Sequence, residues 1–148
     1  MTKMTIGYPS KIRLKLFSTE APLAVNLLRV VIGWIFVQEG LGKLLGWFGG
    51  GGLEGTSAYF RGLGIPFAEF CAYLVAYSES LCGVAFIFGF MVRPAAVIIG
   101  IIMAVAIITA HRQGGFNFPL LLLAACVLFL QAGAGVISLD RLLSRRKR

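Results

Sequence analysis

The sequence predicts an all-α polytopic membrane protein, a bundle of four transmembrane helices with both termini on the cytoplasmic side. Three observations lead to this fold class. Hydrophobic residues make up 58% of the 148 residues and charged residues only 14%, whereas charged residues alone form about a quarter of a typical soluble domain. The apolar residues fall into four long runs. Most of the basic residues lie before the first run or after the last one.

Each apolar run is long enough to cross a bilayer as a helix, which needs roughly 20 residues for a 30 Å hydrocarbon core. None of the runs alternates in the way that the strands of a membrane barrel would. A proline lies at or near the start of each run, where its missing N–H is tolerated. We therefore expect one transmembrane domain over residues 21–137, with helices at approximately 22–44, 67–90, 93–112 and 118–136.

The basic residues predict the orientation of these helices. With both termini inside, ten Lys and Arg residues lie on the cytoplasmic side, in the arm of residues 1–20, at Arg93 and in the tail of residues 138–148. Only Lys43, Arg61 and Arg112 lie on the outer side, as the positive-inside rule requires. The net charge of +8 is explained by these flanks and by anionic lipid. No nucleic-acid motif accompanies it, so the expected partner is the lipid bilayer and not a nucleic acid.

The longest loop, residues 45–66, contains four consecutive glycines, which resist regular structure. We expect one helical turn after them, capped by Thr56 and ended by Gly62 or Gly64. The aromatic residues of this loop suit the headgroup layer. Two interpretations remain open: an interfacial connector, or a lid over an outward-facing pocket.

Charges within the membrane are costly and should find partners. Arg29 lies roughly 10 Å, and Glu79 roughly 16 Å, from the cytoplasmic end of their helices at about 1.5 Å per residue. We therefore predict a buried ion pair between Arg29 and Glu79 near mid-membrane. Its simplest role is to fix the register of the first two helices, whose small and polar faces should meet.

A second polar group gathers within about 10 Å of the outer interface. It offers a carboxylate, an ammonium, a phenol and an imidazole, a set able to move protons. Snorkelling of the long side chains into the headgroups is the alternative explanation. The members of this candidate outer-side pocket are Glu39, Lys43, Glu69, Tyr73 and His111.

The sequence carries no sign of a bound redox centre. The three cysteines form no C-x-x-C motif, and only Cys71, near a helix end, is a candidate reactive thiol. His111 is the only histidine, which excludes a haem held by two histidines of one protomer and makes a metal centre unexpected. We expect no covalently bound cofactor, so electrons would need a quinone or the cofactor of a partner.

Several segments together resemble the DoxX family over roughly Leu27 to His111. They are Leu28–Arg29–Val30–Val31–Ile32–Gly33, Gly40–Leu41–Gly42–Lys43, Gly62–Leu63–Gly64–Ile65–Pro66, Glu79 before Gly83, Gly89–Phe90–Met91–Val92–Arg93–Pro94–Ala95–Ala96, and His111. The resemblance implies a four-helix protein of the bacterial inner membrane. Some relatives are subunits of a thiosulfate:quinone oxidoreductase, and others act with redox-defence enzymes or in the detoxification of quinone-like compounds. The lack of a cysteine pair argues against a thiol–disulfide mechanism in this chain.

The resemblance makes an integral subunit of a membrane redox system the leading hypothesis. Such a subunit would contact a quinone or a partner oxidoreductase, and the chain would be at most an accessory subunit of the enzyme. The first alternative is a non-enzymatic scaffold or assembly factor. The second is a small transporter that works as a homo-oligomer, although the sequence shows no inverted repeat.

Overall fold

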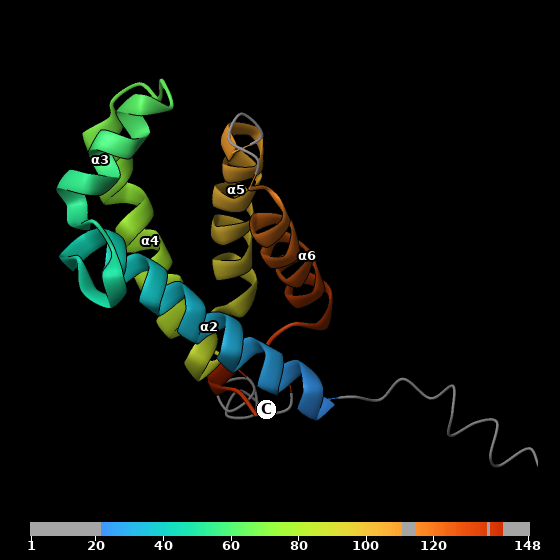
Figure 1. The fold of residues 1–148 in the computed structure, drawn as a ribbon. Coiled ribbons are helices and arrows are strands. Elements are labelled where there is room, and N and C mark those ends of the chain that lie inside the picture. Colours follow the sequence, from blue (N-terminus) through green and yellow to red (C-terminus); the bar gives the residue numbers. More distant parts are fainter. Residues whose placement is uncertain (1–21, 111–114, 136, 141–148) are drawn as a thin grey trace, which may run out of the picture.

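The computed structural model describes residues 22–110, 115–135 and 137–140, and every regular element within these ranges is helical. The predicted four-helix membrane bundle is confirmed, because α2, α4 and α5 are long and apolar enough to span a membrane and α6 is a shorter apolar helix. The predicted arm and nearly all of the predicted tail lie outside the described residues. The elements in chain order are α2 (Pro22–Leu45), the 3₁₀ turn η1 (Trp47–Gly49), α3 (Gly52–Gly62), α4 (Ala68–Phe88), α5 (Val92–Ala110) and α6 (Asn117–Ala132) (Figure 1).

Helices α2 and α4 cross at close range because glycines leave no side chain between their backbones. A Cβ atom added to Gly33 would lie 2.8 Å from the carbonyl oxygen of Gly83, and one added to Gly83 would lie 2.7 Å from the nitrogen of Val37. Gly40 approaches Ser80 as closely. Small residues allow such contacts between membrane helices. The predicted meeting of these two faces is confirmed.

Three phenylalanines connect this pair of helices to α6. Phe36, Phe86 and Phe129 are fully buried, with ring centroids 6.3 Å apart for Phe36 and Phe86 and 5.3 Å apart for Phe86 and Phe129. Helix α5 adds Val92 and Ile99, two turns apart on one face and equally buried. The core therefore joins α2 and α4 to a second pair, α5 and α6, which pack on each other.

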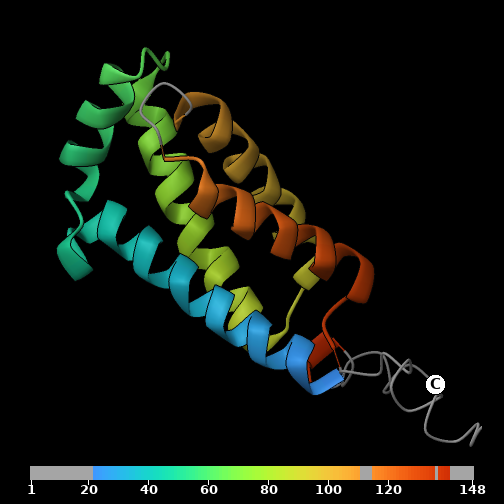
Figure 2. The same ribbon diagram turned by 45° about the vertical axis from the view of Figure 1, so that its right-hand side comes forward.

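The two pairs of helices converge at one end of the bundle and separate toward the end that carries α3 (Figure 1). The start of α2, the α4–α5 turn and residues 137–140 all lie at the convergent end (Figure 2). The described ends of the chain thus lie on the same side of the bundle. That this side is cytoplasmic stays a prediction from the basic residues.

The loop between α2 and α4 is more helical than the sequence predicts. Helix α3 begins at Gly52, four residues before the expected turn, and ends at Gly62, with Gly64 in the left-handed conformation at φ 75°. Thr56 does not cap the helix, because its hydroxyl donates to the carbonyl of Gly52 at 2.7 Å. The glycine run serves to turn the chain sharply, with Gly50 packed against Gly42.

Glycines also end two helices earlier than the apolar pattern predicts. Helix α6 ends at Ala132 and not at residue 136, because Gly133 and Gly135 take φ values of 69° and 78°. Helix α4 ends at Phe88, because Gly89 takes φ 67°. A left-handed residue at this position is a common way to stop a helix, and apolar runs that continue past it do not reveal the stop.

Candidate functional site

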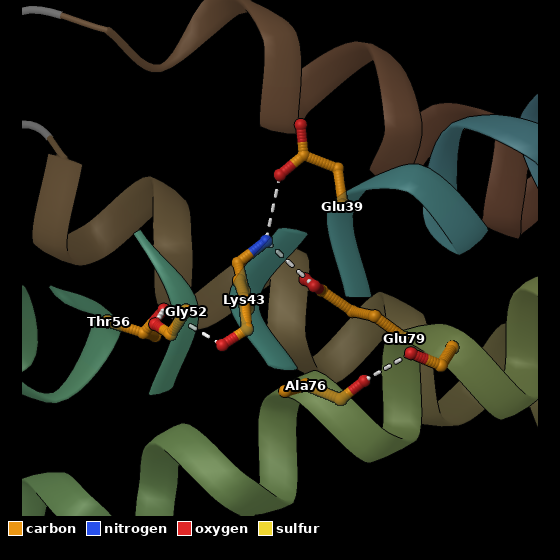
Figure 3. Close-up of polar contacts among 7 residues, drawn as sticks. Glu39, Lys43, Gly52, Thr56, Ala76 and Glu79 are labelled. Atoms are coloured by element: carbon orange, nitrogen blue, oxygen red, sulfur yellow. Dashed lines mark hydrogen bonds and ion pairs between the residues drawn. The ribbon is translucent and has the colours of Figure 1, made fainter. Parts of the chain in front are cut away.

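Three charged side chains form a cluster between α2 and α4, shown in Figure 3. The Nζ of Lys43 lies 2.8 Å from Oε2 of Glu39 and 2.7 Å from Oε2 of Glu79. The Glu79 side chain is only 3% exposed, whereas that of Lys43 is 24% and that of Glu39 48% exposed. One ammonium group is therefore shared between an enclosed carboxylate and an open one.

Local structure explains how these groups meet. Glu39 and Lys43 are four residues apart, so they lie one above the other on the same face of α2. Gly40 lies on α2 between them and allows the backbone of α4 to approach at Ser80 and Ala76. This close approach brings Glu79, the residue before Ser80 on α4, within reach of Lys43. A larger residue at position 40 would separate the two helices.

The cluster forms one wall of a cavity of about 500 Å³. Helix α3 contributes Tyr59 and Phe60 to this cavity, and the following turn contributes Leu63. The loop that the sequence predicts as a connector or a lid therefore lines the pocket. Further side chains come mainly from α5 and α6 and are almost all apolar: Ile101, Ile102, Met103, Val105, Ala106, Thr109, Phe118, Pro119 and Leu122.

The structure brings together only part of the predicted outer-side pocket. Glu39 and Lys43 line the cavity, but Glu69 and Tyr73 are not among its lining residues. Glu69 is 76% exposed on its side chain and pairs with Arg61 at 3.4 Å. Tyr73 lies half-exposed on α4, next to the buried Ala72 and outside the buried face of that helix. His111 lies outside the described residues.

The predicted ion pair between Arg29 and Glu79 is wrong. Arg29 is buried, but its guanidinium donates to the carbonyl oxygens of Ala134 and, at 2.8 Å, of Ile137. The crossing of α2 and α4 sets a register in which Arg29 lies against Gly89. Gly89 is ten residues from Glu79, or about 15 Å along a helix. Estimates of depth from the sequence could not establish this register.

Asp140 completes the environment of Arg29 and was not expected from the sequence to have a role. Its carboxylate accepts hydrogen bonds from the backbone N–H groups of Met91, at 2.9 Å, and Val92, at 3.3 Å, at the start of α5. Its own N–H donates to the carbonyl of Gly89 at 3.1 Å. Asp140 also interacts electrostatically with Arg29. These contacts tie the segment after α6 to α2 and to the α4–α5 turn.

The three cysteines differ in how deeply they are buried. Cys82 and Cys126 are buried in the core, where a thiol behaves as a small hydrophobe. Cys71 is partly exposed and lines the cavity. Across the part of the chain that the structure describes, no three His, Cys, Asp or Glu side chains gather as a metal site would require.

Comparison with known proteins gives the family. The model of the DoxX family matches residues 24–112. The Bacillus subtilis (strain 168) protein named "Putative oxidoreductase CatD" is 33% identical over 126 residues, covering 82% of this chain and 88% of that protein. No solved structure matches the chain.

Two further relatives are membrane proteins by name. The "Uncharacterized membrane protein Rv3486" of Mycobacterium tuberculosis (strain ATCC 25618 / H37Rv) is 32% identical over 151 residues, covering 89% of this chain and 88% of that protein. The "Inner membrane protein YphA" of Escherichia coli (strain K12) is 27% identical, covering 84% of this chain and 94% of that protein. Together with its apolar helices, these matches make this chain a multi-pass membrane protein. The chain belongs to the DoxX family.

Proposed function

We propose that this protein is an integral membrane subunit that binds a quinone and acts with a partner oxidoreductase. The observation that carries the proposal is the cavity, which is apolar on most sides and charged on one wall within the span of the helices. A volume of about 500 Å³ falls in the range of small-molecule sites. A quinone is an apolar ring with carbonyl oxygens that accept hydrogen bonds, so it matches both kinds of wall.

Lys43 is the residue best placed to bind a carbonyl oxygen. An ammonium group has three N–H donors, and two of them point to Glu39 and Glu79. Among the described residues the third has no acceptor within the site, while Lys43 itself lines the cavity. The two carboxylates hold the ammonium in place, so a ligand would meet a donor that is already oriented.

The charge of the cluster argues for a neutral ligand. Glu39 and Glu79 together outweigh the single positive charge of Lys43, so an anion would meet net repulsion at this wall. An anionic electron donor such as thiosulfate would therefore react on a partner and not in this cavity. Quinones, which are uncharged, avoid this repulsion.

Reduction of a bound quinone needs an electron donor. The proposal therefore includes a partner oxidoreductase that supplies the electrons. The name of CatD, which describes that protein as an oxidoreductase, supports the redox character of this group of relatives. We further propose that the protein lies in a bacterial inner membrane with both termini cytoplasmic. In that orientation the cavity lies toward the outer half of the membrane, with Tyr59 and Phe60 of α3 among its lining residues.

Calorimetric titration of the purified protein with duroquinone tests this function. We expect saturable binding, weakened about tenfold in the double variant Lys43→Met/Glu79→Gln, because one hydrogen bond of about 1.4 kcal/mol is lost. The double change removes both charges of the enclosed pair, so no buried charge is left without a partner. Glu69→Gln is the matched control, since it alters a carboxylate outside the cavity and should leave the affinity unchanged.

The titration, together with a measurement of solute flux, separates the alternative functions. Absence of saturable binding in the unmodified protein would contradict the quinone proposal and favour a scaffold or assembly factor. Solute flux in proteoliposomes without quinone binding would favour an oligomeric transporter. Equal loss of affinity in the double variant and in Glu69→Gln would show that the cavity is not the binding site.

A further inference from the structure

The cavity beside Lys43 has an apolar edge between α4 and α5. Leu74 on α4 is 56% exposed, and Ile101 and Val105 on α5 are 60% and 49% exposed, yet all three line the cavity. A side chain that lines a cavity and is also half exposed lies at its opening. Figure 1 shows the two pairs of helices separating toward the end that carries α3. The cavity is therefore open at the side of the bundle.

This opening lies at the depth of the hydrocarbon core. Leu74, Ile101 and Val105 lie about 9, 14 and 8 Å from the ends of α4 and α5 at the open side of the bundle, at about 1.5 Å per residue. All three belong to the segments of these helices that can span a membrane. Because acyl chains surround a membrane helix at this depth, the opening faces lipid.

The other exposed parts of the cavity edge differ in chemistry or in depth. Glu39 is charged, so an alkyl chain would avoid it. Tyr59 belongs to α3, outside the spanning helices, and Phe118 is the second residue of α6. Both are half-exposed aromatic residues, which suit the headgroup layer. An alkyl chain therefore finds its apolar path out of the cavity between α4 and α5.

We propose that this opening is a lateral portal to the bilayer, and that the ligand of the cavity is a neutral amphiphile. Its polar head meets Lys43, and its apolar tail lies between Leu74 on one side and Ile101 and Val105 on the other. Lys43 and the portal residues line the same cavity, so one molecule can contact both. The choice of a quinone as the head rests on the proposed function, whereas the portal and the tail do not.

The portal determines the route of the ligand more than its affinity. An alkyl tail that enters the portal exchanges contacts with lipid for contacts with protein side chains that are equally apolar. The affinity of the head for Lys43 is therefore nearly the same with or without a tail. The position of the tail, and not the strength of binding, is the property to measure.

Photo-labelling in lipid nanodiscs measures that position. Two probes carry the same ten-carbon tail with a diazirine at its middle, one on a ubiquinone head and the other on a hydroxyl group. Mass spectrometry then identifies the labelled residues. We expect labelling of Leu74, Ile101 and Val105 that an excess of decylubiquinone or decanol abolishes. Leu81 and Ile108, which are more exposed on the same helices and do not line the cavity, should be labelled without competition.

A matched pair of variants tests the opening itself. Val105→Trp places a large ring in the portal and should reduce the competed labelling of Leu74 about tenfold, because the tail no longer fits there. Ile108→Trp adds the same ring on α5 outside the cavity and should leave the labelling of Leu74 unchanged. Equal effects of the two variants would contradict the portal.

The location of the labels decides between the routes. Competed labelling at Tyr59 or Phe118 with none at Leu74 would overturn the portal, as would labelling that no competitor reduces. The two probes separate this proposal from the proposed function. Competed labelling by the hydroxyl probe alone would contradict quinone binding and leave the portal standing. A saturable duroquinone titration without competed labelling between α4 and α5 by either probe would contradict the portal alone.

Discussion

Lys43 and Arg29 are both basic residues of α2, yet their partners differ in kind. Lys43 binds two carboxylates, one of them buried on α4. Arg29 binds the carbonyl oxygens of Ala134 and Ile137, where the chain leaves α6. The planar guanidinium has five N–H donors and suits several carbonyls at once, whereas an ammonium acts as a compact charge. Each residue thus stabilises a different junction of the bundle.

The buried pair predicts an asymmetry between single and double substitutions. Lys43→Met alone should destabilise the protein by about 3–5 kcal/mol, because it leaves Glu79 enclosed without a counter-charge. Lys43→Met/Glu79→Gln should be less destabilising than this single change. Unfolding in mixed detergent micelles measures both. Glu69→Gln breaks the exposed pair with Arg61 and should change stability by only about 0–1 kcal/mol. A double variant as unstable as Lys43→Met would contradict the pairing.

At the scale of elements, the crossing of α2 and α4 determines the geometry of the site. Glycines at positions 33, 40 and 83 allow the two backbones to touch, and this contact fixes which residues lie opposite each other. The register places Lys43 near Glu79 and Arg29 against Gly89. The charged cluster is therefore a consequence of helix packing and not of charge attraction alone.

Adding a methyl group at this crossing of α2 and α4 should destabilise the protein. Gly40→Ala places a Cβ atom against the backbone of Ser80, which cannot move without shifting α4. We expect a loss of about 1–3 kcal/mol of stability, as for other overpacked contacts. Gly55→Ala is the control, since a Cβ atom there meets nothing within 4 Å. Because alanine favours helices, that change should be neutral or stabilise by about 0.5–1 kcal/mol. Thermal unfolding in detergent compares the two, and equal effects would contradict the packing argument.

The whole molecule is a pair of helix pairs, closed at one end and open at the other. At the closed end Asp140 and Arg29 hold the segment after α6 against α2 and the start of α5. At the open end α3 packs against α4 and α2, and its Tyr59 and Phe60 line the cavity. This arrangement leaves the charged cluster of Glu39, Lys43 and Glu79 near the end where the helix pairs separate.

The positive-inside rule predicts which end faces the cytoplasm. A green fluorescent protein fused after Arg148 should fold and fluoresce, because we expect that end in the cytoplasm. Alkaline phosphatase fused after Gly64 should be active, because it folds only outside. The measurement is the fluorescence and phosphatase activity of whole cells. Phosphatase activity at the C-terminal fusion together with inactivity after Gly64 would reverse the orientation.

The sequence by itself determined the number of membrane helices, their approximate extents and the faces on which α2 and α4 meet. These features depend on local properties, namely the length of apolar runs and the position of small residues along one helix. For the same reason Glu39 and Lys43 could be recognised as members of one site, since they are four residues apart on one helix.

Only the tertiary structure decided the partner of each buried charge and the presence of the cavity. Periodicity gives the face of a helix but not its register against a neighbour, so the depth estimates favoured Arg29 as the partner of Glu79, although the partner in the structure is Lys43. Glu69 and Tyr73 were assigned to the site by their depth near the outer interface, and depth does not give the direction in which a side chain points. The apolar walls from α5 and α6 carry no sequence signal, since the same residues would face lipid equally well. These side chains form one site only through contacts between segments that are far apart in the sequence, and no local pattern predicts such contacts.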